Sequence, residues 1–255
     1  MKKIFILTAL FGCVVLTPAQ AQENWTEIGI YGFLTHIEGP VRVGNVKADV
    51  DISFSDILNH LDMAFMGFIE HRRGRWSFIG DVAYLDVSKD KHKSLTPISS
   101  STLDFKAYQI MSEGFIGYRV LEQDYGDAQF GLDLLGGARY NKIKVGLDTR
   151  AILLGLKRSS DRNPEKDWVD GVVALRAQYG RNIGWGVSFW ADIGNGSDSS
   201  SYQLFGIVSY RFKNKIRVNF GYRLYSYEFS GRSRGIKFKA DLDYPGPMIG
   251  VSYRF

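Results

Sequence analysis

Apolar and polar side chains alternate, residue by residue, along six long segments of this chain. In 248–255 the odd positions from Ile249 to Phe255 are apolar or aromatic, and the even positions after Met248 are Gly, Ser or Arg. The same alternation recurs in 130–140, 169–179, 185–193, 203–212 and 216–227. Successive side chains of a strand point to opposite faces of its sheet. The chain is therefore predicted to form strands with one apolar face and one polar face.

The alternating segments are long enough to cross a membrane. A tilted transmembrane strand needs roughly 9–11 residues, whereas strands of soluble proteins are most often about 5–6 residues long. Aromatic residues lie near the segment ends, where the interfacial girdles of a membrane barrel are expected. These residues are Tyr140, Trp185, Tyr210, Phe212, Tyr253 and Phe255. The pattern indicates that the apolar faces meet lipid.

The connections alternate between short and long. The short ones are 72–75, 121–126, 181–184 and 213–215; the long ones are 37–61, 88–102, 141–167 and 230–245. Short periplasmic turns and long outer loops are typical of outer-membrane barrels. We therefore predict an all-β, closed, antiparallel, up-and-down barrel of ten strands, with eight as the alternative count. The predicted strands are 25–36, 62–71, 76–87, 103–119, 127–140, 168–180, 184–194, 202–212, 215–229 and 246–255.

The N-terminus has the pattern of a secretory signal peptide. Lys2 and Lys3 precede the uncharged, mostly apolar stretch 4–16, and Ala19-Gln20-Ala21 matches the small-x-small cleavage pattern. We expect cleavage after Ala21, with 22–255 as the barrel domain; lipidation at Cys13 is the minor alternative. Loss of the two lysines lowers the formal charge from +5 to +3. Basic residues are spread along the chain, so nucleic acid is not an expected partner.

Several segments resemble small Gram-negative outer-membrane barrels of the OmpW-like and opacity-like kind. The terminal Phe255, after an alternating segment, is similar to the C-terminal signature that the barrel assembly machinery reads. The other segments that carry the resemblance are Gly74-Arg75-Trp76 through Asp81 and Tyr84, Asp167-Trp168-Val169-Asp170, Gly221-Tyr222-Arg223 and Gly250–Phe255. The resemblance implies integral outer-membrane localisation and a barrel fold, and implies nothing definite about activity.

The polar faces of the strands predict a charged barrel interior. Six carboxylates and seven arginines fall on these faces: Glu70, Asp81, Glu113, Asp133, Asp170, Asp192, Arg119, Arg139, Arg176, Arg211, Arg217, Arg223 and Arg254. Side chains can fill a small barrel, and arginine pairs bidentately with carboxylates. We favour a lumen filled by ion pairs over a narrow pore for small solutes. Segment 25–36 has apolar residues on both faces, so its lumen face stays unassigned.

The long connection 37–61 contains a predicted helical turn over 55–61. Ser53 is placed to cap it, with Asp56 three residues on. Its apolar face is predicted to comprise Phe54, Ile57, Leu58 and Leu61. The turn is interpreted as a lid packed on other loops, with a plug in the barrel mouth as the alternative.

No pattern indicates catalysis, and neither a metal nor a cofactor is expected. Barrel-shaped hydrolases of the outer membrane use a histidine, but the four histidines here are His36, His60, His71 and His92. None of the four has a candidate catalytic partner at a suitable spacing. We interpret His60, beside Asp56 and Asp62, as part of a capped loop. After removal of 1–21 the chain has no cysteine, and it lacks a paired-histidine motif.

The predicted outer loops are rich in basic residues. In the last loop these are Arg232, Arg234, Lys237 and Lys239. Each basic residue close to an anionic membrane surface gains about 1 kcal/mol, so contact with lipopolysaccharide phosphates is a hypothesis, against a merely solvated loop surface. The predicted function is non-enzymatic: small-solute passage or structural support of the membrane. The alternative is a surface protein whose loops bind lipopolysaccharide or a host partner.

Overall fold

The computed structural model describes residues 24–255 except 44–45, 97–98, 154–155, 163–164 and 234–235. The predicted signal peptide lies outside the described residues. In the described part, the chain forms one antiparallel sheet and a single short helix, α1 (Phe54–Asn59). No helix among these residues is long and apolar enough to cross a membrane.

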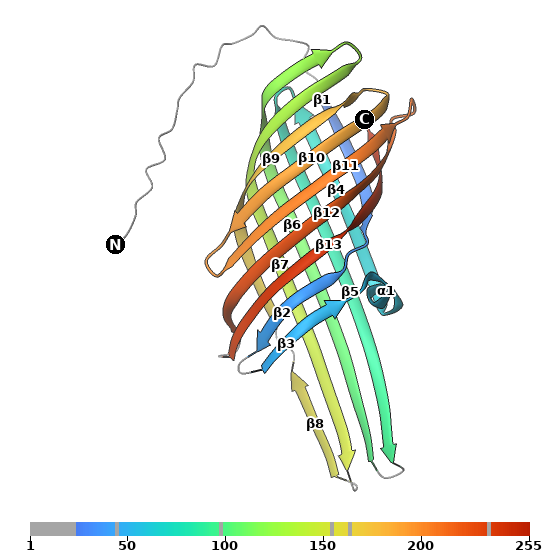
Figure 1. The fold of residues 1–255 in the computed structure, drawn as a ribbon, viewed down its shortest axis with the longest axis vertical. Helices are drawn as coiled ribbons and strands as arrows, with labels where there is room; N and C mark the ends of the chain where they lie inside the picture. The colour runs from blue at the N-terminus through green and yellow to red at the C-terminus, as the bar shows by residue number, and fades with distance from the viewer. Residues whose placement is uncertain (1–23, 44–45, 97–98, 154–155, 163–164, 234–235) are drawn as a thin grey trace, which may run out of the picture.

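Ten strands of the described chain close into an antiparallel barrel (Figure 1). Consecutive strands are neighbours, and the barrel closes where the first pairs with the last, with Ile28 opposite Tyr253. The ten-stranded prediction is therefore confirmed, and the count of eight is excluded. The barrel strands are β1 (Asn24–Phe33), β4 (Leu61–Arg73), β5 (Trp76–Thr96), β6 (Ser99–Tyr125), β7 (Ala128–Leu153), β9 (Glu165–Arg181), β10 (Gly184–Asn195), β11 (Ser199–Arg211), β12 (Ile216–Ser233) and β13 (Ile236–Arg254).

The two ends of the barrel differ. Both ends of the described chain lie at one end with the short turns, which we call the turn end (Figure 1). Gly74, Gly126 and Gly184 take positive φ angles of 58°, 71° and 111° in three of these turns. Glycine has no Cβ and adopts such angles without strain. The opposite end, called the loop end, carries the long hairpins.

The predicted long loops are largely strands, which corrects the sequence interpretation. β5, β6 and β7 continue well past the predicted ends, and β12 and β13 continue to Ser233 and from Ile236. Three further strands flank the barrel at the loop end: β2 (Ile37–Val43), β3 (Val46–Ile52) and β8 (Leu156–Arg162). Beyond the lipid the outer face meets water, so a strand needs no apolar side chain there. The alternation of apolar and polar residues therefore ends there, while the backbone hydrogen bonds between the strands continue.

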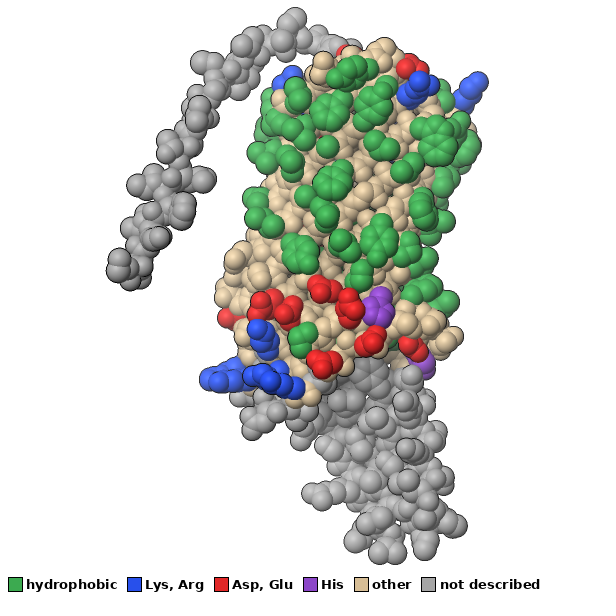
Figure 2. Space-filling model, in the orientation of Figure 1, with side chains coloured by type: hydrophobic (Ala, Val, Ile, Leu, Met, Phe, Trp, Pro, Cys, Tyr) green, Lys and Arg blue, Asp and Glu red, His purple; other side chains and the backbone are tan. Residues whose placement is uncertain are grey.

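The outer wall carries a broad band of apolar side chains (Figure 2). Ile30, Val173, Phe189, Ile193 and Phe220 lie in this band and are between 50 and 64% exposed. Aromatic pairs gather near the turn end: Trp76 with Tyr118, Trp185 with Tyr210, and Tyr253 with Phe255. An apolar exterior bounded by aromatic side chains matches the belt, about 25 Å tall, of transmembrane barrels.

Candidate functional site

Charged side chains form three groups inside the barrel, and ion pairs and hydrogen bonds hold each group together. The first surrounds Asp133 of β7, whose side chain is fully buried. Its carboxylate binds Arg72 at 2.9 Å, Arg119 at 2.7 Å and Arg176 at 2.8 Å. Arg176 also forms two hydrogen bonds, of 2.9 and 2.8 Å, to Glu70 of β4. Buried charges are tolerated when they are paired and hydrogen-bonded. Each charge of this group is paired within the lumen, although Nε and Nη1 of Arg72 have no hydrogen-bond partner among the described residues.

The second group lies at the turn end around Glu27 of β1. Its carboxylate is within 3.1 Å of Arg211, 3.2 Å of Arg217 and 2.9 Å of Arg254. Ser252 donates a further hydrogen bond of 2.7 Å to Glu27. Arg217 and Arg254 keep 24% and 21% of their side-chain surface exposed, so this group borders the solvent at the barrel mouth.

The third group centres on Arg139 of β7, which is fully buried. Its guanidinium contacts Glu113 at 2.5 Å, Asp192 at 2.8 Å and the Ser201 hydroxyl at 2.9 Å. The guanidinium also lies 5.1 Å from the ring centroid of Tyr225 on β12. A single arginine thus links the strands β6, β10, β11 and β12.

Three interior charges are less completely paired. Asp170 forms no ion pair with a described residue, but accepts hydrogen bonds from Ser199 and Ser201. Asp81 accepts one hydrogen bond, of 2.8 Å, from Tyr31. Arg223 lies 3.9 Å from its nearest carboxylate oxygen, which belongs to Glu113. These contacts place all thirteen charged residues of the predicted network in the barrel interior.

The sequence reasoning missed two members of the interior network. Arg72 was expected in a turn at 72–75, but β4 runs to Arg73, and Arg72 is 2% exposed inside the barrel. Glu27 belongs to segment 25–36, whose lumen face could not be assigned from the sequence. In the structure, Ile28 and Ile30 face lipid, which turns Glu27 inward. With these two, the described interior holds seven carboxylates and eight arginines.

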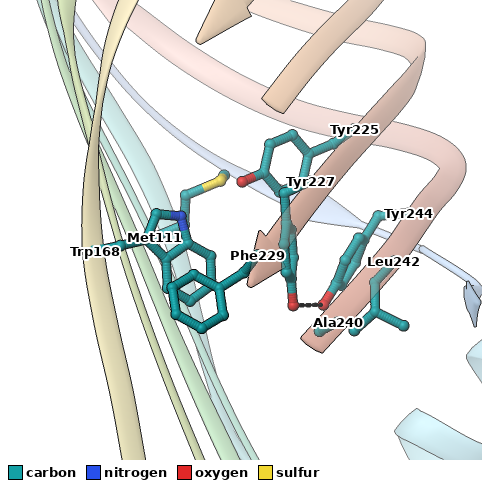
Figure 3. Close-up of a cluster of buried hydrophobic side chains, with 8 residues drawn as sticks. All are labelled: Met111, Trp168, Tyr225, Tyr227, Phe229, Ala240, Leu242 and Tyr244. Carbon is teal, nitrogen blue, oxygen red and sulfur yellow. Dashed lines mark hydrogen bonds between the residues drawn. The ribbon is translucent and has the colours of Figure 1, made fainter. Parts of the chain in front are cut away.

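An aromatic cluster fills the interior nearer the loop end (Figure 3). The Trp168 ring on β9 stacks on Phe229 of β12, with ring centroids 4.9 Å apart, and lies 5.2 Å from Tyr227. Tyr227 and Tyr244 share a hydrogen bond of 3.1 Å, and Tyr244 donates to Gln109. The cluster comprises Met111, Trp168, Tyr225, Tyr227, Phe229, Ala240, Leu242 and Tyr244.

The aromatic cluster was also missed from the sequence, although a signal for it existed. Tyr225, Tyr227 and Phe229 follow Arg223 at every second residue, so they share its face of β12. Arg223 was assigned to the lumen, and continuing this assignment by three steps would have placed all three aromatic side chains inside.

The helix α1 is capped by Ser53, whose hydroxyl accepts a 3.2 Å hydrogen bond from the Asp56 amide. It lies at the side of the barrel wall beside β5 (Figure 1), rather than in the lumen. Ile57 is buried and Phe54 and Leu61 are partly buried, but Leu58 is 56% exposed. The predicted apolar face is therefore wrong at Leu58, because the helix packs with one narrow side only.

The basic residues proposed to contact lipopolysaccharide lie at the tip of the β12–β13 hairpin. Arg232 and Lys237 are opposite each other and exposed. The Lys239 ammonium is 2.5 Å from Glu228, and this hydrogen bond raises the pKa of Lys239. Arg234 lies outside the described residues. On the visible face, acidic side chains separate the apolar band from the basic ones (Figure 2).

The histidines occupy separate places. His36 is 3.2 Å from Asp51 of β3, and the His60 ring is 2.7 Å from the Asp56 carbonyl oxygen. His71 contacts Thr26 at 3.0 Å near the turn end, and the side chain of His92 is not among those described. Within the described ranges, no three His, Cys, Asp or Glu side chains are grouped to hold a metal ion.

The apolar outer wall, the charged interior and the ladder closed between β1 and β13 define a transmembrane β-barrel of the outer-membrane type. Its fold is similar to that of the outer membrane protease OmpT from Escherichia coli, with 11% identity and a TM-score of 0.56; the match covers 94% of this chain and 99% of that one. The translocator domain of the autotransporter NalP from Neisseria meningitidis matches with 12% identity and a TM-score of 0.51, covering 91% and 89%.

At such low identities these likenesses show the fold alone. No family model matches the sequence. No curated protein matches it either. Function must therefore be argued from the barrel interior and the loop end.

Proposed function

We propose that this chain is a non-enzymatic outer-membrane barrel whose lumen is closed at rest, and whose role is structural support of the membrane and presentation of its loop end. The observation that carries the proposal is that side chains join non-neighbouring strands through the lumen at two levels. Arg176 of β9 binds Glu70 of β4, and Trp168 of β9 stacks on Phe229 of β12. Such bridges obstruct the path of a solute through the lumen, which supports closure.

The buried ion pairs also support a closed lumen. Asp133 and Arg139 have fully buried side chains, and each is held by at least two groups of opposite charge. Removing one partner of a buried pair leaves an uncompensated charge, at a cost of about 3–5 kcal/mol. Opening a path through these layers requires breaking several such pairs together. Closure is therefore the stable state of the isolated barrel.

The experiment that tests closure is conductance in planar lipid bilayers. We expect the refolded protein to insert without producing channel steps above the leak of the bare membrane. A variant that shrinks two rings of the aromatic cluster should be compared in the same membranes. Regular conductance steps from the unaltered protein would overturn the proposal.

Small-solute passage is the second candidate, and one observation favours it. A cavity of about 170 Å³ lies in the lumen between Glu27 and Glu113, lined by both charged and aromatic side chains. Passage would require the aromatic cluster to move aside. Conductance that appears only under an applied voltage would favour this candidate.

Binding at the cell surface is compatible with a closed barrel. Exposed Arg232 and Lys237 face each other across the β12–β13 hairpin and are suited to phosphate groups such as those of lipopolysaccharide. Neutralising both residues should weaken retention on lipopolysaccharide vesicles. Unchanged retention would leave these residues as a solvated surface.

The placement of the chain in the outer membrane completes the proposal. We infer export with a cleaved signal peptide, the turn end facing the periplasm, and insertion by the barrel assembly machinery through Phe255. Phe255 is 55% exposed and continues the outward face of Tyr253 and Val251, so it is accessible on the closing strand. The kinship with OmpW-like and opacity-like barrels is part of this proposal. Fractionation of membranes with mass spectrometry of the mature N-terminus tests both location and cleavage.

A further inference from the structure

The lumen cavity lies between Glu27, nearer the turn end, and Glu113, nearer the loop end. Ser188, Ser209 and Asn219, which line it nearer the turn end, are partly exposed. Trp190 and Arg223, which line its deeper part, are 4% and 3% exposed. We therefore expect access to the cavity from the turn end, past Arg217 and Arg254, which are partly exposed.

Two charges of opposite sign that lack close partners line this pocket. Asp81 forms no ion pair with a described residue, and its carboxylate accepts only the hydroxyl hydrogen of Tyr31. Arg223 is 3.9 Å from Glu113, but that carboxylate is already held at 2.5 Å by Arg139. The pocket therefore offers one carboxylate and one guanidinium with unused hydrogen-bonding capacity.

Two residues that line the pocket each carry a buried polar atom without a hydrogen-bond partner among the described residues. One is the Nε of Arg223, and the other is the Oε1 of Gln203. The Nε2 of Gln203 donates to Asp192 at 2.9 Å, which orients its side chain. Buried polar groups are nearly always paired, so each unpaired one requires an explanation. Both atoms are shielded from the cavity in the described conformation, so a bound molecule reaches them only when the two side chains rotate.

The remaining wall of the pocket has an apolar part beside two ion pairs, Arg176 with Glu70 and Arg217 with Glu27. The rings of Trp190 and Phe205 stack with centroids 5.5 Å apart, and Phe115 meets Trp190 edge-on at 5.1 Å. Phe68 and Ile207 extend this wall. Small-molecule sites typically combine such an apolar lining with a few placed polar groups.

We propose that this pocket binds a small zwitterion with an apolar body, of the size and chemistry of a free hydrophobic α-amino acid. Its carboxylate pairs with Arg223, and its ammonium pairs with Asp81. Its side chain packs on the stacked rings of Trp190 and Phe205. A ligand with only one charge would engage only one of Asp81 and Arg223. This inference goes beyond the closed-barrel proposal, because binding from the turn end requires no passage.

The test is isothermal titration calorimetry on the folded barrel in detergent micelles, with L-phenylalanine as the probe. Phenethylamine lacks the carboxylate, and 3-phenylpropanoate lacks the ammonium group, so the three ligands share one apolar body. Since hydrogen bonds to charged groups are strong, we expect each analogue to bind roughly ten- to a hundredfold more weakly. Absence of saturable L-phenylalanine binding, or equal binding of all three, would overturn the proposal.

Two variants test which pocket residue binds the carboxylate of the ligand and which binds its ammonium group. Arg223→Gln should remove the preference for L-phenylalanine over phenethylamine, and Asp81→Asn should remove the preference over 3-phenylpropanoate. Asp170→Asn is the matched control, because Asp170 is also without an ion pair but does not line the pocket. Unchanged preferences in both pocket variants would contradict the assignment. Folding is checked by heat-modifiable migration; if a variant does not fold, the comparison of ligands on the unaltered protein decides.

Discussion

Trp168 of β9 and Phe229 of β12 stack inside the barrel with their ring planes inclined by 27°. The two strands are separated in the wall by β10 and β11, so the stack spans the lumen instead of joining neighbours. Phe229 is 1% exposed and Trp168 is 8% exposed. In the closed barrel that we propose, this contact and the charged groups nearer the turn end together block the interior.

Shortening both rings of this stack should remove one of the two layers that close the lumen. We expect the double variant Trp168→Ala, Phe229→Ala to produce occasional, brief conductance steps in planar bilayers where the unaltered protein produces none, because only the charged groups then remain in the path. The control is Phe189→Ala, which removes a ring from the lipid face. Equally silent membranes with the folded double variant would show that the charged groups alone seal the barrel.

Asp133→Asn should strongly destabilise the barrel. The substitution leaves Arg72, Arg119 and Arg176 together around an uncharged amide in a buried site. Loss of one member of a buried ion pair costs about 3–5 kcal/mol, so the urea midpoint of unfolding in lipid vesicles should fall markedly.

The matched control for Asp133 is Asp127→Asn. Asp127 pairs with Arg181 at 3.2 Å, but both side chains are more than half exposed. Exposed ion pairs contribute about 0–1 kcal/mol, so this variant should unfold almost like the unaltered protein. Equal destabilisation by the two substitutions would contradict the buried, shared role of Asp133.

An arginine introduced on the lipid face should reveal the position of the membrane. Val173 is 57% exposed in the apolar band, and Val173→Arg is expected to destabilise the barrel by about 2–4 kcal/mol near the bilayer midplane. Ser230→Arg lies beyond the band on β12 and should have little effect. Tolerance of arginine at Val173 in the lipid-embedded protein would show that this face does not contact hydrocarbon.

Removal of the α1 cap should affect that helix locally. Ser53→Ala deletes the hydroxyl that accepts the Asp56 amide hydrogen, and loss of an N-cap costs about 0.5–2 kcal/mol. Amide hydrogen exchange of residues 56–59 should accelerate, while exchange in the barrel strands stays unchanged. Asn59→Ala, at the other end of the helix, serves as the comparison; identical exchange in both variants would argue against the cap.

The sequence by itself determined the barrel. Alternation such as that from Ile249 to Phe255 can be recognised from successive residues alone, because each strand meets lipid on one side and the polar interior on the other. Ten strands, the charged lumen face and the Ser53 cap follow from such local signals. The alternation ends where the outer face leaves the lipid and meets water. Polar side chains suit both faces there, so the extensions of β5, β6 and β7 were interpreted from the sequence as loops.

Only the tertiary structure decided which interior residues meet. Glu27 and Arg211 are 184 positions apart in the chain, yet they are bound because β1 closes on β13 and turns Glu27 inward. Cross-lumen partners such as Trp168 and Phe229 depend on the diameter and stagger of the closed sheet, which no single strand encodes. Only the tertiary structure likewise shows that Asp81 forms no ion pair with a described residue and that the nearest carboxylate oxygen to Arg223 is 3.9 Å away.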